Sequence, residues 1–482
     1  MYYTEGEARE QTTLFPELID DYITNENPVR FIEAFVESLD VAQLGFTHSE
    51  LKTTGRPPYH PKALLKLYLY GYLNRIRSSR MLERETKRNL EMFWLLQKLS
   101  PDHKTISNFR TENQKAIKET FKEFVKLCRK LELFGAELIA IDSTKYRASN
   151  SRSQIKDSKQ LSKSIERIEE SITKYLKQLD SNDEEENKEL QNESKLTKSK
   201  LEKKIAFLKR REKKLKEAQK KLLESGRKYI SLTDEDCRLV KSRGKIIPGY
   251  SVHNSADSKH CLISDFAVTQ DAADNNHLSE VSVMAKETLE KETIKVCADA
   301  GYYDSDEIKK CEDASITTYL PTPKQRVSKK TNVPEPDYHH DKFKYDQGTD
   351  SYKCPAGENL TYYSKARKNG REILIYRTDA CNDCKYRKLC TTSKRGRHIQ
   401  RWEHEDVLET MRDRMAKQPE IFKMRKSIVE HPFGTMKKIW GYSTFLLRGL
   451  DKVTVEVSLM TLSYNIKRAI TILGVDELVR VI

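Results

Sequence analysis

Apolar residues recur at helical spacing from residue 16 to about residue 131, and this pattern predicts a run of short helices. One helix begins at His60-Pro61, where proline suits the first turn, and another begins near Ser79. Several arginines fall on these helices, including Arg80 and Arg84. They suit a relative of the helix-turn-helix that places one helix in the DNA major groove. A helical packing domain with a basic, solvated face is the alternative of equal weight.

The pattern changes at residue 137. Short apolar runs with β-branched residues predict buried strands at 137–142, 294–299 and 317–321. Alternating apolar and polar residues predict a pair of hairpin strands at 249–253 and 259–269. Helical patterns flank the strand at 294–299, over 278–291 and 305–311. This mixture predicts an α/β fold, in which helices pack on a sheet.

Residues 157–225 interrupt that region with a heptad pattern. Apolar residues step by four and three in both arms, if Glu212 takes one seam position, at Leu161, Ile165, Ile168, Ile172, Tyr175 and Leu179, and then at Leu201, Ile205, Leu208, Leu215 and Leu222. The pattern predicts an antiparallel coiled-coil hairpin with the acidic segment 180–187 at its tip. The returning arm, 195–221, carries 13 Lys or Arg against 3 Glu. This surface suits a DNA backbone or another subunit's acidic tip, and a merely solvated face is the alternative.

Composition narrows the classes of function. The formal net charge is +15 and the pI is about 9.1, which favours a polyanionic partner such as nucleic acid or an anionic membrane surface. No stretch approaches 18 consecutive apolar residues, and the polar residues 1–13 are unlike a secretory signal. We therefore expect a cytoplasmic protein with no membrane partner. Five of the nine cysteines are scattered singly, which argues against a disulfide framework.

Two acidic residues follow predicted strands. Asp142 and Asp299 each end an apolar run, and a carboxylate in that position is costly unless it is paired or binds a cation. If the strands are neighbours, the two carboxylates meet at one sheet edge and suit Mg²⁺ or Mn²⁺. A third acid would complete a two-metal site for phosphodiester chemistry. Glu430 is the best candidate, although a surface ion pair is the commoner role for such a glutamate. Lys437, about two helical turns later, would project from the same face and reach a phosphate beside the metals as a catalytic residue.

Three motifs carry a family resemblance: Ile141-Asp142-Ser-Thr-Lys145, Cys297-Ala-Asp299-Ala-Gly-Tyr302, and Ile428-Val-Glu430-His-Pro-Phe-Gly434 with Lys437. Further matching segments are Arg56-Pro-Pro-Tyr-His-Pro61, Ser231-Leu-Thr-Asp-Glu-Asp236, Leu447-Arg-Gly-Leu450 and Tyr464-Asn-Ile-Lys-Arg468. Over nearly the whole chain, except the hairpin, the sequence resembles the DDE transposases of bacterial insertion sequences. The resemblance implies an RNase H-like mixed sheet flanked by helices. It also implies that Asp142, Asp299 and Glu430 are the metal ligands.

The sequence departs from one signature of related families, Tyr-x2-Arg-x3-Glu-x6-Lys. Lys423 and Lys426 stand where the tyrosine and arginine would be, whereas Lys437 matches. We treat Arg425 and Lys426 as interchangeable candidates for a phosphate contact. Trp440 is a candidate to stack on an unpaired or flipped base, with a core position as its alternative.

The resemblance implies a transposase that binds double-stranded transposon ends and target DNA as a homodimer or higher oligomer. It would cut the ends and join them by phosphoryl transfer, and it would be nucleoid-associated when bound to DNA. Two alternatives stay open. One is an RNase H-like nuclease without strand transfer, and the other is a non-catalytic DNA-binding protein derived from a transposase.

Four cysteines cluster late in the chain, at Cys354, Cys381, Cys384 and Cys390. Four thiolates with one C-x2-C pair suit a structural Zn²⁺ site, and ordinary reduced thiols are the alternative. The surrounding residues are poor in aliphatic side chains, so a metal would help them to hold a shape. The expected organisation is a helical DNA-binding domain (1–131), a catalytic core (132–156, 226–322 and 401–482), the coiled-coil hairpin (157–225) and a Cys-rich insertion (323–400).

Overall fold

The computed structural model describes residues 18–50, 57–185, 198–242, 244–323 and 333–482, so Arg56 and the end of the predicted acidic tip, 186–187, lie outside the described residues. The chain divides into two compact units. The first comprises Met1–Gly135, Asp142–Ala272 and Ile428–Ile482, and the second comprises Ala136–Ile141 and Ala273–Ser427. Among the described helices, none combines the length and the apolar character needed to cross a membrane.

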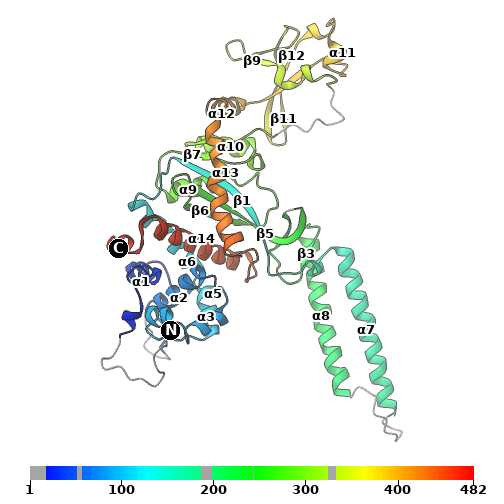
Figure 1. Ribbon diagram of the computed structural model, residues 1–482. Coiled ribbons are helices and arrows are strands. Elements are labelled where there is room, and N and C mark those ends of the chain that lie inside the picture. The colour runs from blue at the N-terminus through cyan, green and yellow to red at the C-terminus, as the bar shows by residue number, and fades with distance from the viewer. Residues whose placement is uncertain (1–17, 51–56, 186–197, 243, 324–332) are drawn as a thin grey trace, which may run out of the picture. The chain divides into compact units, whose positions relative to one another are not determined.

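The N-terminal part of the first unit is helical, which confirms the pattern in the sequence (Figure 1). Its α-helices are α1 (Pro28–Ser38), α2 (Pro61–Leu73), α3 (Ser79–Glu85), α4 (Leu90–Leu95), α5 (His103–Glu112) and α6 (Gln114–Lys130). Asp102 caps α5, because its carboxylate accepts hydrogen bonds from the Thr105 hydroxyl (2.7 Å) and from the Thr105 (3.0 Å) and Lys104 (2.8 Å) amides. These hydrogen bonds, with that of the Thr105 hydroxyl the largest influence, lower the pKa of Asp102 to about 2.

A long helix, α14 (Leu450–Leu473), lies buried in the first unit and is followed by α15 (Val475–Arg480). It packs against α6 and α2. A helix that is buried on several faces must satisfy its polar side chains internally. Asn465 does so with the backbone of Ile263, donating to its carbonyl (2.7 Å) and accepting from its amide (2.9 Å).

Glu456 on α14 forms a buried ion pair with Arg77, which lies between α2 and α3. The Arg77 Nη1 atom is 2.9 Å from Glu456 Oε1, and the Glu456 side chain is fully buried. The same carboxylate accepts hydrogen bonds from the amides of Leu446 and Leu447. The Arg77 guanidinium also lies 4.4 Å from the centre of the Tyr442 ring. The helical N-terminal part is therefore tied to α14 by a desolvated charge pair.

The main sheet confirms the strands expected from the short apolar runs, and adds β4. Its strands are β1 (Leu138–Arg147), β4 (Arg238–Ser242), β5 (Lys245–Asp257), β6 (Ile263–Thr269), β7 (Ile294–Cys297) and β8 (Ile316–Tyr319). In the first unit, β5 pairs antiparallel with both β4 and β6. In the second unit, β1 pairs in parallel with β7, which pairs in parallel with β8. The strand order β4-β5-β1-β7-β8 makes this a mixed sheet.

Helices of the second unit pack beside its parallel strands. They are α9 (Leu278–Thr288), α10 (Ser305–Asp313), α12 (Glu405–Lys417) and the first part of α13 (Pro419–Phe433). α10 contacts α9, α12 and β8. Arg414 of α12 forms an ion pair of 2.6 Å with Glu312 of α10, and that carboxylate also accepts a hydrogen bond from the Thr318 amide on β8. The helices flanking the strand at 294–299 are thus confirmed.

Two long helices, α7 (Ser158–Glu185) and α8 (Lys198–Glu224), occupy the region with the heptad pattern. Most of the predicted seam residues are buried, nearly all of these in one cluster that also includes Ile230, whereas Tyr175, Leu179 and Leu208 are partly buried. Contacts between the helices show that they are antiparallel, because residue numbers rise along α7 as they fall along α8, in the pairs Ser162–Gln219, Glu169–Lys216 and Tyr175–Lys204. α7 continues to Glu185, so most of the expected acidic tip is helical.

A short ladder closes the base of this pair. β2 (Ile155–Lys156) precedes α7, β3 (Ile230–Ser231) follows α8, and the two strands pair antiparallel. The chain therefore enters and leaves the α7–α8 pair at adjacent positions.

The Cys-rich segment forms a second sheet with a core of its own. Its strands, in the order β13-β12-β11-β10-β9, are β9 (Lys344–Asp346), β10 (Ser351–Lys353), β11 (Asn359–Lys368), β12 (Arg371–Arg377) and β13 (His398–Trp402). The short helix α11 (Arg387–Cys390) lies between β12 and β13 in the chain. Its buried cluster consists of Phe343, Tyr352, Leu360, Tyr376 and Ile399. Aromatic side chains therefore form much of this core, although the segment is poor in aliphatic residues.

Candidate active site

Asp142 lies within β1, and Asp299 lies two residues after the end of β7, the parallel neighbour of β1. Ala140 of β1 is the register partner of Cys297 of β7, and each aspartate lies two residues further along its own strand direction. Both side chains are half-buried. The Asp142 carboxylate accepts a hydrogen bond from the Ser143 amide at 2.8 Å. β1 continues to Arg147, so the expectation that Asp142 ends a strand is wrong, whereas Asp299 does follow the end of β7.

Asp299 is held by the turn that follows it. It caps a short 3-10 helix, Ala300–Tyr302, by accepting a hydrogen bond from the Gly301 amide at 2.9 Å. A Cβ atom on Gly301 would lie 2.9 Å from Asp299 Oδ1 and 3.8 Å from Asp274 Oδ2. A side chain at position 301 would therefore force the Asp299 carboxylate to shift, and Asp274 is a further carboxylate that borders the same turn. Nothing in the spacing of the sequence pointed from Asp274 to Asp299.

Glu430 lies near the end of α13 with its side chain exposed, while the preceding Ile428 and Val429 are buried. Residues Gly434–Ile439 then wind as a π-helix rather than continuing the α-helix. The spacing argument assumed two α-helical turns between Glu430 and Lys437, so that assumption is wrong. Single π-helical turns are often found at functional sites.

Lys437 is fixed on β1 close to Asp142. Its ammonium group donates hydrogen bonds to Thr144 Oγ1 and to the Lys145 carbonyl, both at 2.8 Å. It also lies 4.6 Å from the centre of the Tyr146 ring. These contacts anchor the turn after Glu430 to the strand that carries Asp142, within the first unit. No spacing rule could have found them.

The predicted DNA contacts have different environments. Arg80 and Arg84 on α3 and Lys426 on α13 are exposed, as a phosphate contact requires. Arg425 is half-buried, with its guanidinium 5.8 Å from the centre of the Phe422 ring. Trp440 is only 5 % exposed and packs edge-on against Tyr442. Its stacking on a DNA base stays a prediction, and its packing matches the core alternative.

The acids have suitable chemistry for a divalent metal, because Mg²⁺ and Mn²⁺ prefer oxygen ligands. Their placement is a separate question. In the part of the chain that the structure describes, no group of three or more His, Cys, Asp or Glu is arranged so that it could hold a metal ion.

The four clustered cysteines line one small cavity of about 30 Å³ in the second sheet region. Arg397 and Phe343 line it as well, and the Arg397 guanidinium lies 5.3 Å from the centre of the Phe343 ring. A Cβ atom on Gly396 would lie 2.8 Å from the Cβ atom of Cys381, so a glycine is needed beside that thiol. Burial raises the pKa of Cys390, which Arg397 lowers and the other three thiols raise further. The sequence cluster is therefore a spatial cluster.

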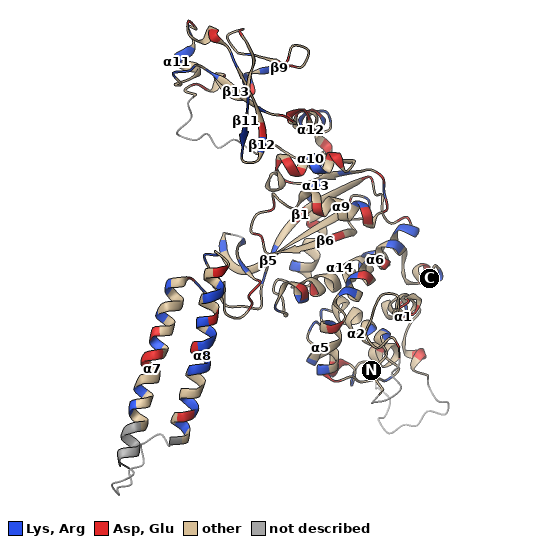
Figure 2. Cartoon of the chain, turned by 180° about the vertical axis from the view of Figure 1, so that it is seen from behind, with Lys and Arg blue, Asp and Glu red and all other residues tan. Residues whose placement is uncertain are grey.

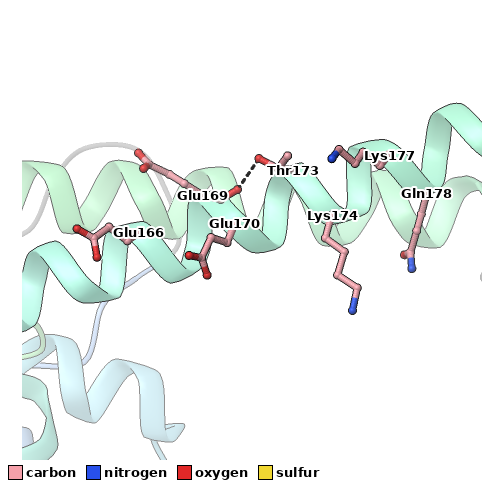
Figure 3. Close-up of a pocket in the computed structure, with 7 residues that line it drawn as sticks. All are labelled: Glu166, Glu169, Glu170, Thr173, Lys174, Lys177 and Gln178. Atoms are coloured by element: carbon pink, nitrogen blue, oxygen red, sulfur yellow. Dashed lines mark hydrogen bonds between the residues drawn. The ribbon is translucent and has the colours of Figure 1, made fainter.

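A shallow hollow of about 800 Å³ lies elsewhere, along α7. Figure 3 shows its lining residues projecting from one helix: Glu166, Glu169, Glu170, Thr173, Lys174, Lys177 and Gln178. The Thr173 hydroxyl donates to the Glu169 carbonyl at 2.9 Å, as threonine often does within a helix. None of the predicted site residues is among them, so this hollow is not the candidate active site.

Two family models match the chain. Residues 17–112 match a model described as a transposase domain (DUF772), and residues 353–470 match one described as a transposase DDE domain. No curated protein and no solved structure matches the chain. Both matches are to transposase domains, and the mixed α/β fold is consistent with that class.

Both matches support a DDE transposase of an insertion sequence. Arg80 and Arg84 lie within the first match, and Glu430, Lys437 and the four clustered cysteines lie within the second. DNA is accordingly the partner that these domains imply. Asp142 and Asp299 lie outside both matches, so their assignment depends on the strand register and the motifs around them.

Proposed function

We propose that this transposase binds the ends of its insertion sequence, cleaves the DNA there and joins the freed 3′-OH to target DNA. Asp142, Asp299 and Glu430 would hold Mg²⁺ or Mn²⁺. Two such ions, when bound, activate the attacking oxygen and stabilise the leaving oxygen of the phosphodiester. The observation that supports the proposal is the register of β1 and β7, in which Ala140 pairs with Cys297, each two residues before one of the aspartates.

The arrangement of strands also supports the proposal. Parallel strands β1, β7 and β8 continue through β1 to a group in which β5 pairs antiparallel with its neighbours. We interpret this mixed sheet as an RNase H-like core, with the third acid on a later helix. The α7–α8 pair would be a coiled-coil insertion between its strands.

The basic residues have separate roles in this proposal. Arg80 and Arg84 would contact the phosphates of the transposon ends, and Arg425 or Lys426 would contact a phosphate near the cleavage site. Lys437 positions the turn after Glu430 on β1 through its hydrogen bonds to Thr144 and Lys145. A homodimer or higher oligomer would hold two ends together on the duplex.

The test uses the full chain and DNA duplexes that contain the two ends of the element. Cleavage and strand transfer are measured with Mg²⁺, and Mn²⁺ binding is measured separately by calorimetry. The variants Asp142→Asn, Asp299→Asn and Glu430→Gln should lose cleavage by orders of magnitude and should weaken Mn²⁺ binding, while they keep end binding. Matched controls are Asp313→Asn and Glu292→Gln, which change exposed acids outside the motifs and should leave both readouts unchanged.

The outcomes separate the alternatives. Cleavage without joined products would indicate an RNase H-like nuclease. End binding without any cleavage in Mg²⁺ or Mn²⁺ would indicate a non-catalytic DNA-binding protein. Normal cleavage by Glu430→Gln would exclude this glutamate as the third ligand.

We also propose that Cys354, Cys381, Cys384 and Cys390 bind one structural Zn²⁺. The support is that all four thiols line one small cavity, although binding would require their side chains to draw together around it. Arg397 at the same cavity would offset the negative charge of four thiolates. Metal analysis of protein kept from chelators should give about one zinc per chain, and Cys381→Ser with Cys384→Ser should release it and open 350–400 to protease. Wild-type protein without zinc would exclude the site.

A further inference from the structure

The outward face of α8 is unusually rich in cations. Between residues 199 and 224 the whole of α8 has eleven Lys or Arg against four Glu, whereas α7 has five against three between residues 158 and 179. Figure 2 shows this contrast as blue covering much of α8 and mixed colours along α7. Since the seam residues face α7, the heptad places exposed cations on the opposite side of α8, at Lys203, Arg210, Lys213 and Lys214. The exposed Glu217 and the ion-paired Lys220 and Lys221 lie on the same side, one turn further along.

These four cations are not neutralised by neighbouring acids. Among the described residues, the ion pairs of α8 involve other lysines, in the pairs Lys216–Glu169, Lys216–Glu212, Lys220–Glu224 and Lys221–Glu235. Lys203, Arg210, Lys213 and Lys214 take part in none of the ion pairs in the described chain. Like charges four residues apart, such as Arg210 and Lys214, disfavour an isolated helix. A negatively charged partner would relieve that repulsion.

An exposed aromatic side chain lies within the same face. Phe207 is 62 % exposed and lies four residues after Lys203 and three before Arg210, so all three project from adjacent turns. A phenyl ring in water gains stability when it is covered. The sugars of a nucleic-acid backbone offer apolar carbons between their phosphates, which suits a phenyl ring set among cations.

We propose that the outer face of α8 around Phe207, hereafter the α8 face, is a second DNA-backbone contact surface, separate from the helical N-terminal part. This inference rests on the proposed function, because it takes duplex DNA as the partner. Residues 203 to 214 span roughly 16 Å along the helix. One strand of a duplex carries a phosphate about every 3.4 Å of axis, so this length faces about five phosphates. The four cations are thus matched by enough phosphates.

The experiment measures binding of the full chain to a duplex of the element's end, without divalent metal, between 50 and 200 mM KCl. The test variant is Lys203→Gln with Arg210→Gln and Lys214→Gln. The matched control removes three exposed cations from α7 instead, by Lys163→Gln, Arg167→Gln and Lys174→Gln. Helix content by circular dichroism confirms that both variants keep the α7–α8 pair.

The test variant should lower the slope of log affinity against log salt by about 2.7, since each phosphate contact contributes about 0.9. The affinity advantage of wild type over this variant should then shrink by about 40-fold from 50 to 200 mM salt. The α7 control should keep the wild-type slope. Phe207→Ala should weaken binding at every salt concentration and leave the slope unchanged, because it removes no charge.

Three results would overturn the inference in distinguishable ways. Equal slopes for wild type and the test variant would remove the α8 face from DNA binding and leave the proposed function standing. The test variant could instead lose self-association in sedimentation while it keeps the wild-type slope of log affinity against log salt. That result would make this face a contact between two copies of the chain. A wild-type chain that binds no duplex would instead reject the proposed function itself.

Discussion

Replacing Glu456 by alanine tests how much the buried pair with Arg77 stabilises the first unit. The change removes an ion pair of 2.9 Å and the acceptor for two backbone amides, in a place where the carboxylate is fully buried. Removing one partner of a buried pair costs about 3–5 kcal/mol. Arg77 keeps a hydrogen bond to the Thr444 carbonyl at 3.1 Å, so we expect the lower end, about 3 kcal/mol.

Hydrogen exchange of the α14 amides measures this loss, because they are protected by opening of the whole packed region. A change of about 3 kcal/mol should speed the slowest of these amides by about 150-fold. The double variant with Arg77→Ala should be little less stable than either single variant, because each single variant already leaves one buried charge without its partner. Lys87→Ala, which breaks an exposed pair with Glu83, should change exchange by less than threefold. If Glu456→Ala behaved like Lys87→Ala, the argument from desolvated charge would be refuted.

Three further predictions concern other parts of the chain. Hydrogen bonding lowers the pKa of Asp102, so its stabilisation of α5 is complete above the unfolded value near 4 and is lost as the pH falls towards about 2. The difference in thermal stability between wild type and Asp102→Asn should therefore shrink between pH 6 and pH 3. A constant difference would contradict the capping role. Lys437→Ala should slow cleavage by about 10- to 150-fold through loss of charge-assisted hydrogen bonds, while Mn²⁺ binding by calorimetry stays normal; a parallel loss of Mn²⁺ binding would show that it acts on the ligands. Replacing 157–225 by a short Gly/Ser linker, together with Ile230→Thr to remove an apolar side chain left uncovered, should give a cooperatively unfolding core by circular dichroism, and aggregation would show that the α7–α8 pair is needed for folding.

Much of the main sheet could be predicted because its strands are short apolar runs with polar ends. Asp142 and Asp299 stood out for the same reason, since each carboxylate directly follows such a run. The heptad seam of α7 and α8 was equally readable, because its period differs from that of the surrounding strands. In each case the signal is local, and the partner strand or helix repeats it.

The rest depended on contacts that leave no local pattern. The approach of Asp274 to the turn after Asp299 joins residues 25 positions apart through Gly301. Lys437 reaches Thr144 from within a π-helical turn, which α-helical spacing does not anticipate. The second sheet was missed because tyrosines such as Tyr352 and Tyr376, rather than aliphatic residues, form its core. Tertiary packing decided these features.

The two-residue ladder of β2 and β3 makes the reach of the α7–α8 pair adjustable. Because the chain enters and leaves at paired strands, the lengths of both helices can change together without altering the register of Ile155 with Ser231. Adding one heptad to each helix would extend the arm by about 10 Å and would preserve the seam. Removing one heptad would shorten it equally. The length of the α7–α8 pair can therefore vary while the pairing of β2 with β3 at its base stays constant.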